Sequence, residues 1–464
     1  MTLIIISLYI NLNFAFPMVD STVFTATTTP FETLSHAQLL KIVSALPDAI
    51  TPAYVYFEDY LLSQINALKQ AFRPVDSAIE CNIRYAMKAQ SNANILKIFA
   101  REGIHFDCSS VYEVMRVMGA GVDPGCIELA SQELTKGQLD MLRKIPGSEK
   151  VKFVASSAIQ LDTLLADEQF KNQVLGLRVN PGFGSGYHSK TVVAGPKYSF
   201  GIWHENLDQI RSDFTVRKIH SHIGAGSDPT YWLKSAEYLM TLIEKRYPHC
   251  EVLNLGGGFK VARGDLDKAI DILPIAREAL EIVTAFNKRT GRTLKIEIEP
   301  GSFLVANSGI LVAEVIDRMS TRTETTAGEG HNFLKLNTGL NEMTRPALYG
   351  AQHSIRFFKR ETEEIGSETI PMVVVGHCCE SGDLITCDPS DSNALREVPV
   401  PASLQPGDFA ILKGVGAYCS AMSLKNYNSF PEAAEVLVRS SGEAVLIRKR
   451  QEFGQIAQNE VDVV

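Results

Sequence analysis

The feature that most constrains the fold is an alternation of short β-rich runs with longer amphipathic stretches, between about residues 80 and 300. This alternation is typical of repeated βα units around a parallel sheet. Eight runs are interpreted as strands, which predicts a closed (β/α)8 barrel. The predicted strands are Ile83–Lys88, His105–Cys108, Ile127–Ala130, Lys152–Ala155, Leu175–Asn180, Lys218–Ile223, Val252–Leu255 and Lys295–Glu299.

Helices are expected between these strands. Apolar residues recur at helical spacing in Asn92–Glu102, Val111–Gly119 and Leu266–Lys288. Ala120-Gly121 supplies a glycine stop for the second helix. The strands and helices together indicate an α/β fold.

A second region begins after Phe303, where short strands alternate with Gly, Pro and Asp clusters. Its predicted strands are Leu334–Leu336, Pro371–Val375, Phe409–Leu412 and Val445–Arg448. We expect four segments: residues 1–40 as a disordered leader, residues 41–75 as a strand and helix contributing to the β-domain, residues 76–305 as the barrel, and residues 306–464 as a C-terminal β-domain. The strand of the second segment is expected at Ala53–Tyr56.

Composition excludes several classes of function. Of 464 residues, 45% are hydrophobic and 21% charged, as in an ordinary globular protein, and the net charge is -8. Lys and Arg are dispersed, so nucleic acid is not an expected partner. Met1–Val19 is apolar but has no basic leader, and Asn11 and Asn13 interrupt it, whereas a membrane span needs about 20 apolar residues. We expect a cytoplasmic protein without a membrane anchor, in which residues 1–17 are an unstructured or misassigned leader and Met18 is the true start.

The cysteines lack the spacing of a zinc site and the density of a disulfide scaffold, so reduced thiols and no metal are expected. They are Cys81, Cys108, Cys126, Cys250, Cys378, Cys379, Cys387 and Cys419.

The chemistry of a barrel lies at the C-terminal ends of its strands. These ends carry Lys88, Asp107, Ser131, Asn180, His222, Gly256-Gly257-Gly258 and Glu299-Pro300-Gly301. A lone lysine at a strand end is most often a surface residue. A partly desolvated lysine near groups that lower its pKa can instead be a neutral amine that forms a Schiff base, and we assign this role to Lys88.

Three further features point to a phosphate-bearing cofactor. Consecutive glycines let backbone N–H groups approach an anion, and the last two strand ends of a barrel commonly bind phosphate. Glu299 supplies a carboxylate able to pair with a protonated ring nitrogen, and His222 a ring that could stack on the cofactor. A lysine, a phosphate cradle and a carboxylate together indicate pyridoxal 5'-phosphate.

The order of motifs resembles the fold-type III pyridoxal phosphate decarboxylases, most closely the bacterial diaminopimelate decarboxylases. The resemblance covers about residues 50 to 455. Its motifs are Tyr85-Ala86-Met87-Lys88, Phe106-Asp107-Cys108-Ser109, Arg178-Val179-Asn180-Pro181-Gly182-Phe183-Gly184, His222-Ile223-Gly224, Gly256-Gly257-Gly258, Glu299-Pro300-Gly301, Arg345-Pro346-Ala347-Leu348-Tyr349, Cys379-Glu380-Ser381-Gly382-Asp383, Gly416-Ala417-Tyr418 and Tyr427-Asn428-Ser429.

The resemblance implies that Lys88 carries the cofactor imine and Glu299 holds the pyridine nitrogen. The other cofactor-binding residues that it implies are Asp107, His222, Gly257, Gly258, Gly301 and Tyr418. It also implies a homodimer with shared active sites, in which Cys379, the proton donor, and Glu380, the anchor for a distal ammonium, come from the partner subunit. Catalysis is thereby assigned to Lys88, Cys379 and His222.

The sequence departs from the family pattern at two positions. Ser302 stands where the resemblance leads us to expect an arginine that binds the distal carboxylate of the substrate, and Ala225 stands where a serine is usual. Arg345 and Tyr349 are retained, and together with Ser302, Glu380 and Tyr418 they are the expected substrate-binding residues.

Because a hydroxyl does not replace a bidentate guanidinium, Ser302 favours a basic amino acid without a distal carboxylate. The leading interpretation is therefore a decarboxylase of D-lysine or D-ornithine that yields cadaverine or putrescine. The alternative, favoured by overall similarity, is a meso-diaminopimelate decarboxylase producing L-lysine. A decarboxylase of a conjugated amino acid in siderophore or antibiotic synthesis is a third candidate.

Two other classes of protein share this barrel fold. A non-catalytic regulatory paralogue should have lost Lys88, Cys379 or the glycines, and all are present. An alanine-racemase-like isomerase shares the lysine, but Cys379-Glu380-Ser381 favours decarboxylation.

Overall fold

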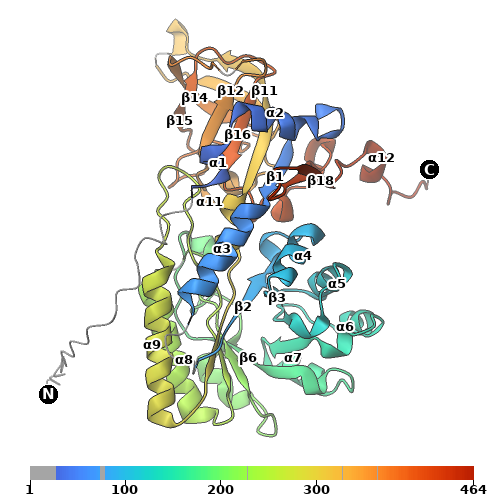
Figure 1. Ribbon diagram of the computed structural model, residues 1–464, viewed down its shortest axis with the longest axis vertical. Helices are drawn as coiled ribbons and strands as arrows, with labels where there is room; N and C mark the ends of the chain where they lie inside the picture. The colour runs from blue at the N-terminus through green and yellow to red at the C-terminus, as the bar shows by residue number, and fades with distance from the viewer. Residues whose placement is uncertain (1–27, 74–78, 227, 327, 363, 464) are drawn as a thin grey trace, which may run out of the picture.

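The computed structural model describes residues 28–73, 79–226, 228–326, 328–362 and 364–463, and its lower half in Figure 1 is a parallel barrel. Eight strands follow the order β2-β3-β4-β5-β6-β8-β9-β10, and β10 pairs with β2 to close the sheet. They are β2 (Cys81–Ala86), β3 (His105–Cys108), β4 (Ile127–Leu129), β5 (Lys152–Ala155), β6 (Val174–Asn180), β8 (Lys218–His220), β9 (Val252–Asn254) and β10 (Lys295–Ile298), with a short β7 (Ile202–Trp203) pairing to β6. The predicted (β/α)8 fold is confirmed, and each predicted strand overlaps an observed one.

Helices on the outside of the barrel begin where polar side chains cap them. The barrel helices are α4 (Ala93–Arg101), α5 (Val111–Gly119), α6 (Lys136–Arg143), α7 (Ala158–Leu165), α8 (Pro229–Arg246) and α9 (Ile272–Thr290). Asn92 and Ser110 accept from backbone N–H groups at the starts of α4 and α5. The prediction of a helix from Leu266 was wrong at its start, because Asp271 is the N-cap of α9 and accepts from the N–H of Leu273.

The upper half of Figure 1 is a β-domain of nine strands. They are β1 (Ala53–Phe57), β11 (Gly309–Ser320), β12 (Asn332–Leu336), β13 (Ile355–Phe358), β14 (Thr369–Val375), β15 (Glu397–Pro401), β16 (Phe409–Lys413), β17 (Ala434–Val438) and β18 (Ala444–Arg448). Strand β1 lies between β11, its antiparallel neighbour, and β17, its parallel neighbour. A strand that precedes the barrel in the chain therefore lies in the middle of this sheet.

The expectation that all of residues 1–40 form a disordered leader was wrong for the described part of that range. Helix α1 (Pro30–Thr33) and helix α2 (His36–Ser44) lie on the β-domain. Ser35 and Gln38 form a capping box at the start of α2, and Leu39 is fully buried in a hydrophobic cluster of the β-domain. Residues 1–27, including Met18, lie outside the described residues.

Helix α3 (Glu58–Ala71) differs from the prediction in the domain that it joins. Its neighbours are α9 and the short α10 (Ser302–Val305), and Leu61, Ile65 and Leu68 are fully buried. Only the strand of the 41–75 segment joins the β-sheet, because the apolar face of α3 is covered by barrel helices.

The barrel interior holds a buried layer of charges. Arg84 donates through Nε and Nη2 to the two carboxylate oxygens of Glu297, at 3.0 Å each. Lys218 lies 2.5 Å from Glu128 Oε2 and also pairs with Glu297. Such paired geometry offsets much of the cost of burying charges. Because side chains alternate along a strand, this layer lies beneath the residues two positions further on, including Glu299.

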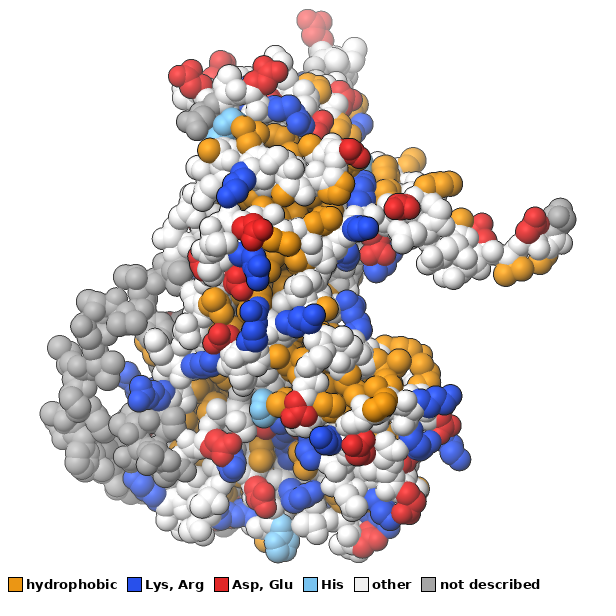
Figure 2. All heavy atoms as spheres, turned by 45° about the vertical axis from the view of Figure 1, so that its right-hand side comes forward, with side chains coloured by type: hydrophobic (Ala, Val, Ile, Leu, Met, Phe, Trp, Pro, Cys, Tyr) orange, Lys and Arg blue, Asp and Glu red, His pale blue; other side chains and the backbone are white. Residues whose placement is uncertain are grey.

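Figure 2 shows acidic and basic side chains interspersed over the face in view, without a broad field of one sign. The C-terminal end of the chain extends away from the body, beyond α12 (Phe453–Ile456). In the described part of the chain, no helix combines the length and the apolar character needed to cross a membrane.

Candidate active site

A cavity opens where four neighbouring barrel strands end. Its walls come from the ends of β2, β8, β9 and β10 and from one loop of the β-domain. The lining residues are Ala86, Lys88, His222, Ala225, Gly226, Gly257, Gly258, Phe259, Glu299, Gly301, Ser302 and Tyr418. Most of the predicted site residues on the barrel, together with Tyr418, are thus found in one place.

Lys88 lies in a tight turn directly after β2, with its side chain 39% exposed. Its Nζ donates to Ser109 Oγ at 3.4 Å and lies 3.9 Å from Asp107 Oδ2. Burial alone would lower the pKa of Lys88, but the charges of Asp107, Tyr418 and Glu299 outweigh it and raise the pKa. The expectation that neighbouring groups lower the pKa of Lys88 was therefore wrong, because acidic groups surround its ammonium.

Glu299 is a buried carboxylate at the end of β10. Asn254 Nδ2 donates to its Oε1 at 2.7 Å, and His220 Nε2 lies 3.2 Å from its Oε2. Burial would raise the pKa of Glu299, but the imidazole of His220 and the ammonium of Lys88 lower it below its usual value. The site therefore keeps a negative charge opposite Lys88.

His220 and Asn254 were not predicted as site residues, although the sequence held a signal for both. Side chains two positions apart on a strand share a face. His220 therefore lies on the same face as His222, while Asn254 ends a strand next to that of Glu299.

His222 presents an uncharged ring to the cavity. Burial and the charges of Lys88 and Arg178 lower the pKa of His222 to about 3. The N–H of Gly257 donates to His222 Nδ1 at 3.3 Å, which orients the ring. A Cβ on Gly256, whose φ is +65°, would lie 2.8 Å from His222, so only glycine leaves the ring in place.

The glycines form a cradle that a side chain would fill. A Cβ on Gly257 would lie 2.2 Å from the carbonyl oxygen of Glu299, and one on Gly301 would lie 3.3 Å from Tyr418 Oη. Tyr418 has a φ of +56°, and its N–H donates to the carbonyl of Ala89, next to Lys88. These residues fit a phosphate approached by backbone and by the Tyr418 hydroxyl.

Arg345 lies in the short helix α11 (Arg345–Tyr349) at the β-domain side of the site and is 6% exposed. Its Nη2 donates to Tyr187 Oη at 3.2 Å, its guanidinium lies 5.7 Å from the centre of the Tyr349 ring, and its buried Nε has no hydrogen-bond partner among the described residues. The two predicted substrate-binding residues are therefore in contact.

Ser302 has a partner that sequence reasoning missed. Arg263, in the loop after β9, donates from Nη2 to Ser302 Oγ at 3.1 Å. Its Nη1 donates to the carbonyls of Gly414 and Ala417, at 3.0 and 2.8 Å. The only sequence signal was indirect, since loops after adjacent strands meet at one end of a barrel.

Cys379 and Glu380 do not join this cavity within one chain. They lie exposed in the loop between β14 and β15. The N–H of Cys379 donates to Asn428 Oδ1 at 2.8 Å, and Tyr427 Oη donates to its carbonyl at 3.4 Å. The structure thus fixes the backbone of Cys379 without bringing its thiol to Lys88.

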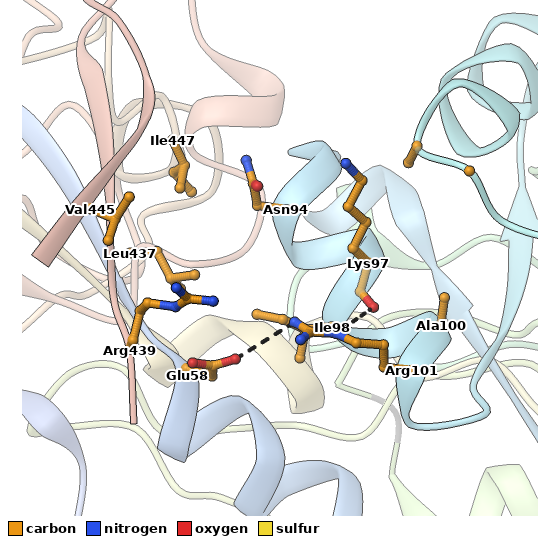
Figure 3. A pocket seen from close by; sticks show the side chains of 12 residues that line it. Glu58, Asn94, Lys97, Ile98, Ala100, Arg101, Leu437, Arg439, Val445 and Ile447 are labelled. Carbon is orange, nitrogen blue, oxygen red and sulfur yellow. Dashed lines mark hydrogen bonds and ion pairs between the residues drawn. The ribbon is translucent and has the colours of Figure 1, made fainter. Parts of the chain in front are cut away.

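A larger cavity, of about 590 Å³, lies between α3, α4 and the β17–β18 hairpin (Figure 3). Glu58 and Arg101 form an ion pair across it, at 3.7 Å. None of the predicted site residues lines it. Size alone therefore does not identify the chemical site, which is defined by its titratable groups.

Comparison with known proteins identifies a cofactor-binding domain in the part of the chain that forms the barrel. The family model for the pyridoxal-binding domain of pyridoxal-dependent decarboxylases matches residues 59–306. The chain belongs to this family, whose members are lyases that use pyridoxal phosphate.

Individual relatives and solved structures are similar to this chain over most of its length. The chain is 31% identical to the diaminopimelate decarboxylase of Escherichia coli K12, over 87% of this chain and 92% of that protein. It is 30% identical to the same enzyme of Streptomyces coelicolor, over 91% and 92%. A crystal structure of diaminopimelate decarboxylase superimposes with a TM-score of 0.77 at 28% identity, covering 95% of this chain and 99% of that one. The Helicobacter pylori enzyme, solved in complex with L-lysine, gives 0.72 at 25% identity, covering 89% and 97%.

Proposed function

We propose that this chain is a meso-diaminopimelate decarboxylase, which removes the carboxylate from the D-configured α-carbon and releases L-lysine. The observation that carries the proposal is Arg345, a buried guanidinium that donates to the hydroxyl of Tyr187 and forms no ion pair with a carboxylate of the described residues. A carboxylate at the far end of the substrate would supply the missing counter-charge. Relatives at 31% and 30% identity that bear this name support the same substrate.

Pyridoxal phosphate supplies a ring that accepts the electron pair left on the α-carbon when carbon dioxide departs. In the proposal, Lys88, with Asp107 3.9 Å from its Nζ, would be the residue that binds the cofactor aldehyde. The negative charge of Glu299 would favour a protonated pyridine nitrogen. The uncharged His222 would help to hold the ring, and Gly257, Gly258, Gly301 and Tyr418 would hold the phosphate.

The proposed proton donor comes from a second subunit. Cys379 and Glu380 are exposed on the β-domain and lie outside the Lys88 cavity of their own chain. We place both in the site of the partner in a two-fold dimer, with the Cys379 thiol protonating the α-carbon and Glu380 binding the distal ammonium. The site is then incomplete in one chain.

Ser302 supports the second candidate, a decarboxylase of D-lysine or D-ornithine. A serine offers no charge to a distal carboxylate, and this supports a substrate with a distal ammonium alone. Against it stands the guanidinium of Arg263, which donates to the Ser302 hydroxyl. Positive charge is therefore close to this position although residue 302 carries none.

The test is carbon dioxide release from meso-diaminopimelate and from both enantiomers of lysine and ornithine. We expect kcat/KM for meso-diaminopimelate to exceed that for D-lysine by about tenfold or more, the worth of one charged hydrogen bond. The L-enantiomers serve as stereochemical controls. A higher kcat/KM for D-lysine or D-ornithine would reject the proposal in favour of the second candidate.

A further inference from the structure

Two guanidinium groups are buried beside the active site without a carboxylate. Arg263 is 4% exposed and Arg345 is 6% exposed. The hydrogen bonds of Arg263 go to two carbonyls and a hydroxyl, and that of Arg345 goes to a phenol. No ion pair joins either guanidinium to a carboxylate within the described ranges. Burying a charge in this way costs several kcal/mol unless a counter-ion is present.

The two groups also repel one another. Burial, followed by the charge of Arg345, lowers the pKa of Arg263 to about 10. Neither nearby carboxylate in the sequence relieves this. Asp265 accepts from the hydroxyl of Ser354 at 2.5 Å, and Asp267 accepts from the backbone N–H of Arg263 and lies 3.8 Å from Lys260. An arrangement that is unfavourable in the free protein becomes favourable when an anion enters between or beside the two cations.

The position of Arg263 is set by the β-domain. A Cβ on Gly414 would lie 2.8 Å from both Cβ and Cγ of Arg263, so glycine at 414 makes room for the side chain. Two carbonyls from the 414–417 loop then hold Nη1, which leaves Nη2 to reach Ser302. Arg263 thus connects the β-domain to a residue that lines the Lys88 cavity.

The contact also orients Ser302. Because the hydroxyl oxygen accepts from Arg263, its own proton points away from the guanidinium. Ser302 lines the cavity, so it presents a polarised donor there. Arg263 and Ser302 together therefore supply a hydrogen-bond donor and a nearby positive charge, both of which an arginine at position 302 would supply by itself.

We propose that Arg263, a positioning residue acting through Ser302, completes with Arg345 a binding site for a carboxylate at the end of the substrate far from the reacting carbon. This inference rests on the proposed function. The cofactor phosphate is an anion of related chemistry, so the test must separate the two sources.

L-lysine and cadaverine form a matched pair of ligands, because they differ only in one carboxylate. Each is titrated into the holoenzyme, and binding is followed by the change in cofactor absorbance. We expect the unmodified enzyme to bind L-lysine more tightly. Arg263→Met should weaken the binding of L-lysine by about ten- to hundredfold and leave the binding of cadaverine unchanged, because it removes both a buried positive charge near the carboxylate and the donor that orients the Ser302 hydroxyl. Arg277→Met, on the exposed face of α9, is the matched control.

Ser302→Ala is the second variant, since it leaves the contacts of Arg263 to Gly414 and Ala417 in place. It should reduce the preference for L-lysine over cadaverine in the same direction and by a smaller factor. The affinity for pyridoxal phosphate, measured by titrating the apoenzyme, should stay within about twofold of the unmodified value in both variants.

If Arg263→Met weakened the binding of L-lysine and cadaverine equally, Arg263 would have a structural role. If it weakened cofactor binding and left the preference for L-lysine unchanged, Arg263 would serve the phosphate. Either result would overturn the inference. Failure of the proposed function is a separate result. It would appear in the unmodified enzyme as a preference for D-lysine over meso-diaminopimelate in carbon dioxide release, whatever the Arg263 variant does.

Discussion

At the scale of single residues, His353 shows how burial near two arginines couples stability to pH. Its Nδ1 lies 2.7 Å from the carbonyl oxygen of Lys413 and therefore carries the proton that it donates. Burial, together with Arg345 and Arg263, lowers the pKa of His353 well below its usual value. The folded state thus binds fewer protons than the unfolded state once the pH falls below about 6.5.

We expect the stability contributed at this position to be full above about pH 6.5 and to decline as the pH falls, by at most about 1.4 kcal/mol per pH unit. His353→Gln should make the stability curve flatter between pH 5 and 6.5 than that of the unmodified protein. Urea unfolding across this range measures the difference. His249→Gln, at an exposed position, should run parallel to the unmodified protein, and parallel behaviour of His353→Gln would refute the account.

The active site divides into residues that the sequence predicts and residues that it does not. Lys88, His222, Gly257 and Glu299 follow strands whose alternation is plain, so their meeting at one barrel end could be predicted. Arg263 could not, because its place depends on carbonyls at positions 414 and 417, far along the chain. The charge of Lys88 could not be predicted from the sequence either, since it depends on the distances to Asp107 and Glu299 rather than on residue type.

At the scale of elements, helix α2 tests whether the described N-terminal segment is part of the folded protein. Leu39 is fully buried in a cluster with residues of the β-sheet, whereas Leu40 is 38% exposed. Leu39→Ala should lower the free energy of unfolding by about 2–5 kcal/mol, the usual cost of a cavity at a buried leucine. Leu40→Ala, a matched change, should cost under about 0.5 kcal/mol. Urea unfolding of the two variants measures both losses in free energy. Similar losses for the two variants would mean that α2 is not packed against the sheet in solution.

The sequence predicted barrel elements better than those of the β-domain. Val111–Gly119 was predicted at its observed bounds, because an apolar stripe and a glycine stop agree there. Strands β11, β13, β15 and β17 of the β-domain were not predicted. Strand β11 is buried in its first half and exposed in its second, so its pattern of apolar residues changes along its length. Helix α2 was missed because its apolar face matters only once the sheet is present.

At the scale of the whole molecule, the proposed dimer predicts complementation between inactive chains. Lys88→Ala lacks the cofactor lysine and Cys379→Ala lacks the proton donor, so each homodimer should be inactive. A mixed dimer would contain one site with both residues intact. Mixing equal amounts under subunit exchange should restore up to about a quarter of the activity, the limit for random pairing in a two-fold dimer.

Carbon dioxide release from the mixture measures the recovery, and native mass spectrometry of differently tagged chains confirms exchange. Two Lys88→Ala chains with different tags, exchanged in the same way, provide the control that should stay inactive. Exchange without recovery would show that each site is built from one chain.

The central place of β1 has a consequence for how the chain folds during synthesis. Ala53 pairs with Val312 on one side and with Ala434 on the other, so one edge of β1 stays open until almost the whole chain has left the ribosome. At the usual rate of translation this interval is about 20–80 s. The barrel can close in that time, but a nascent chain meanwhile exposes an apolar strand edge of the kind that chaperones bind and that aggregates join.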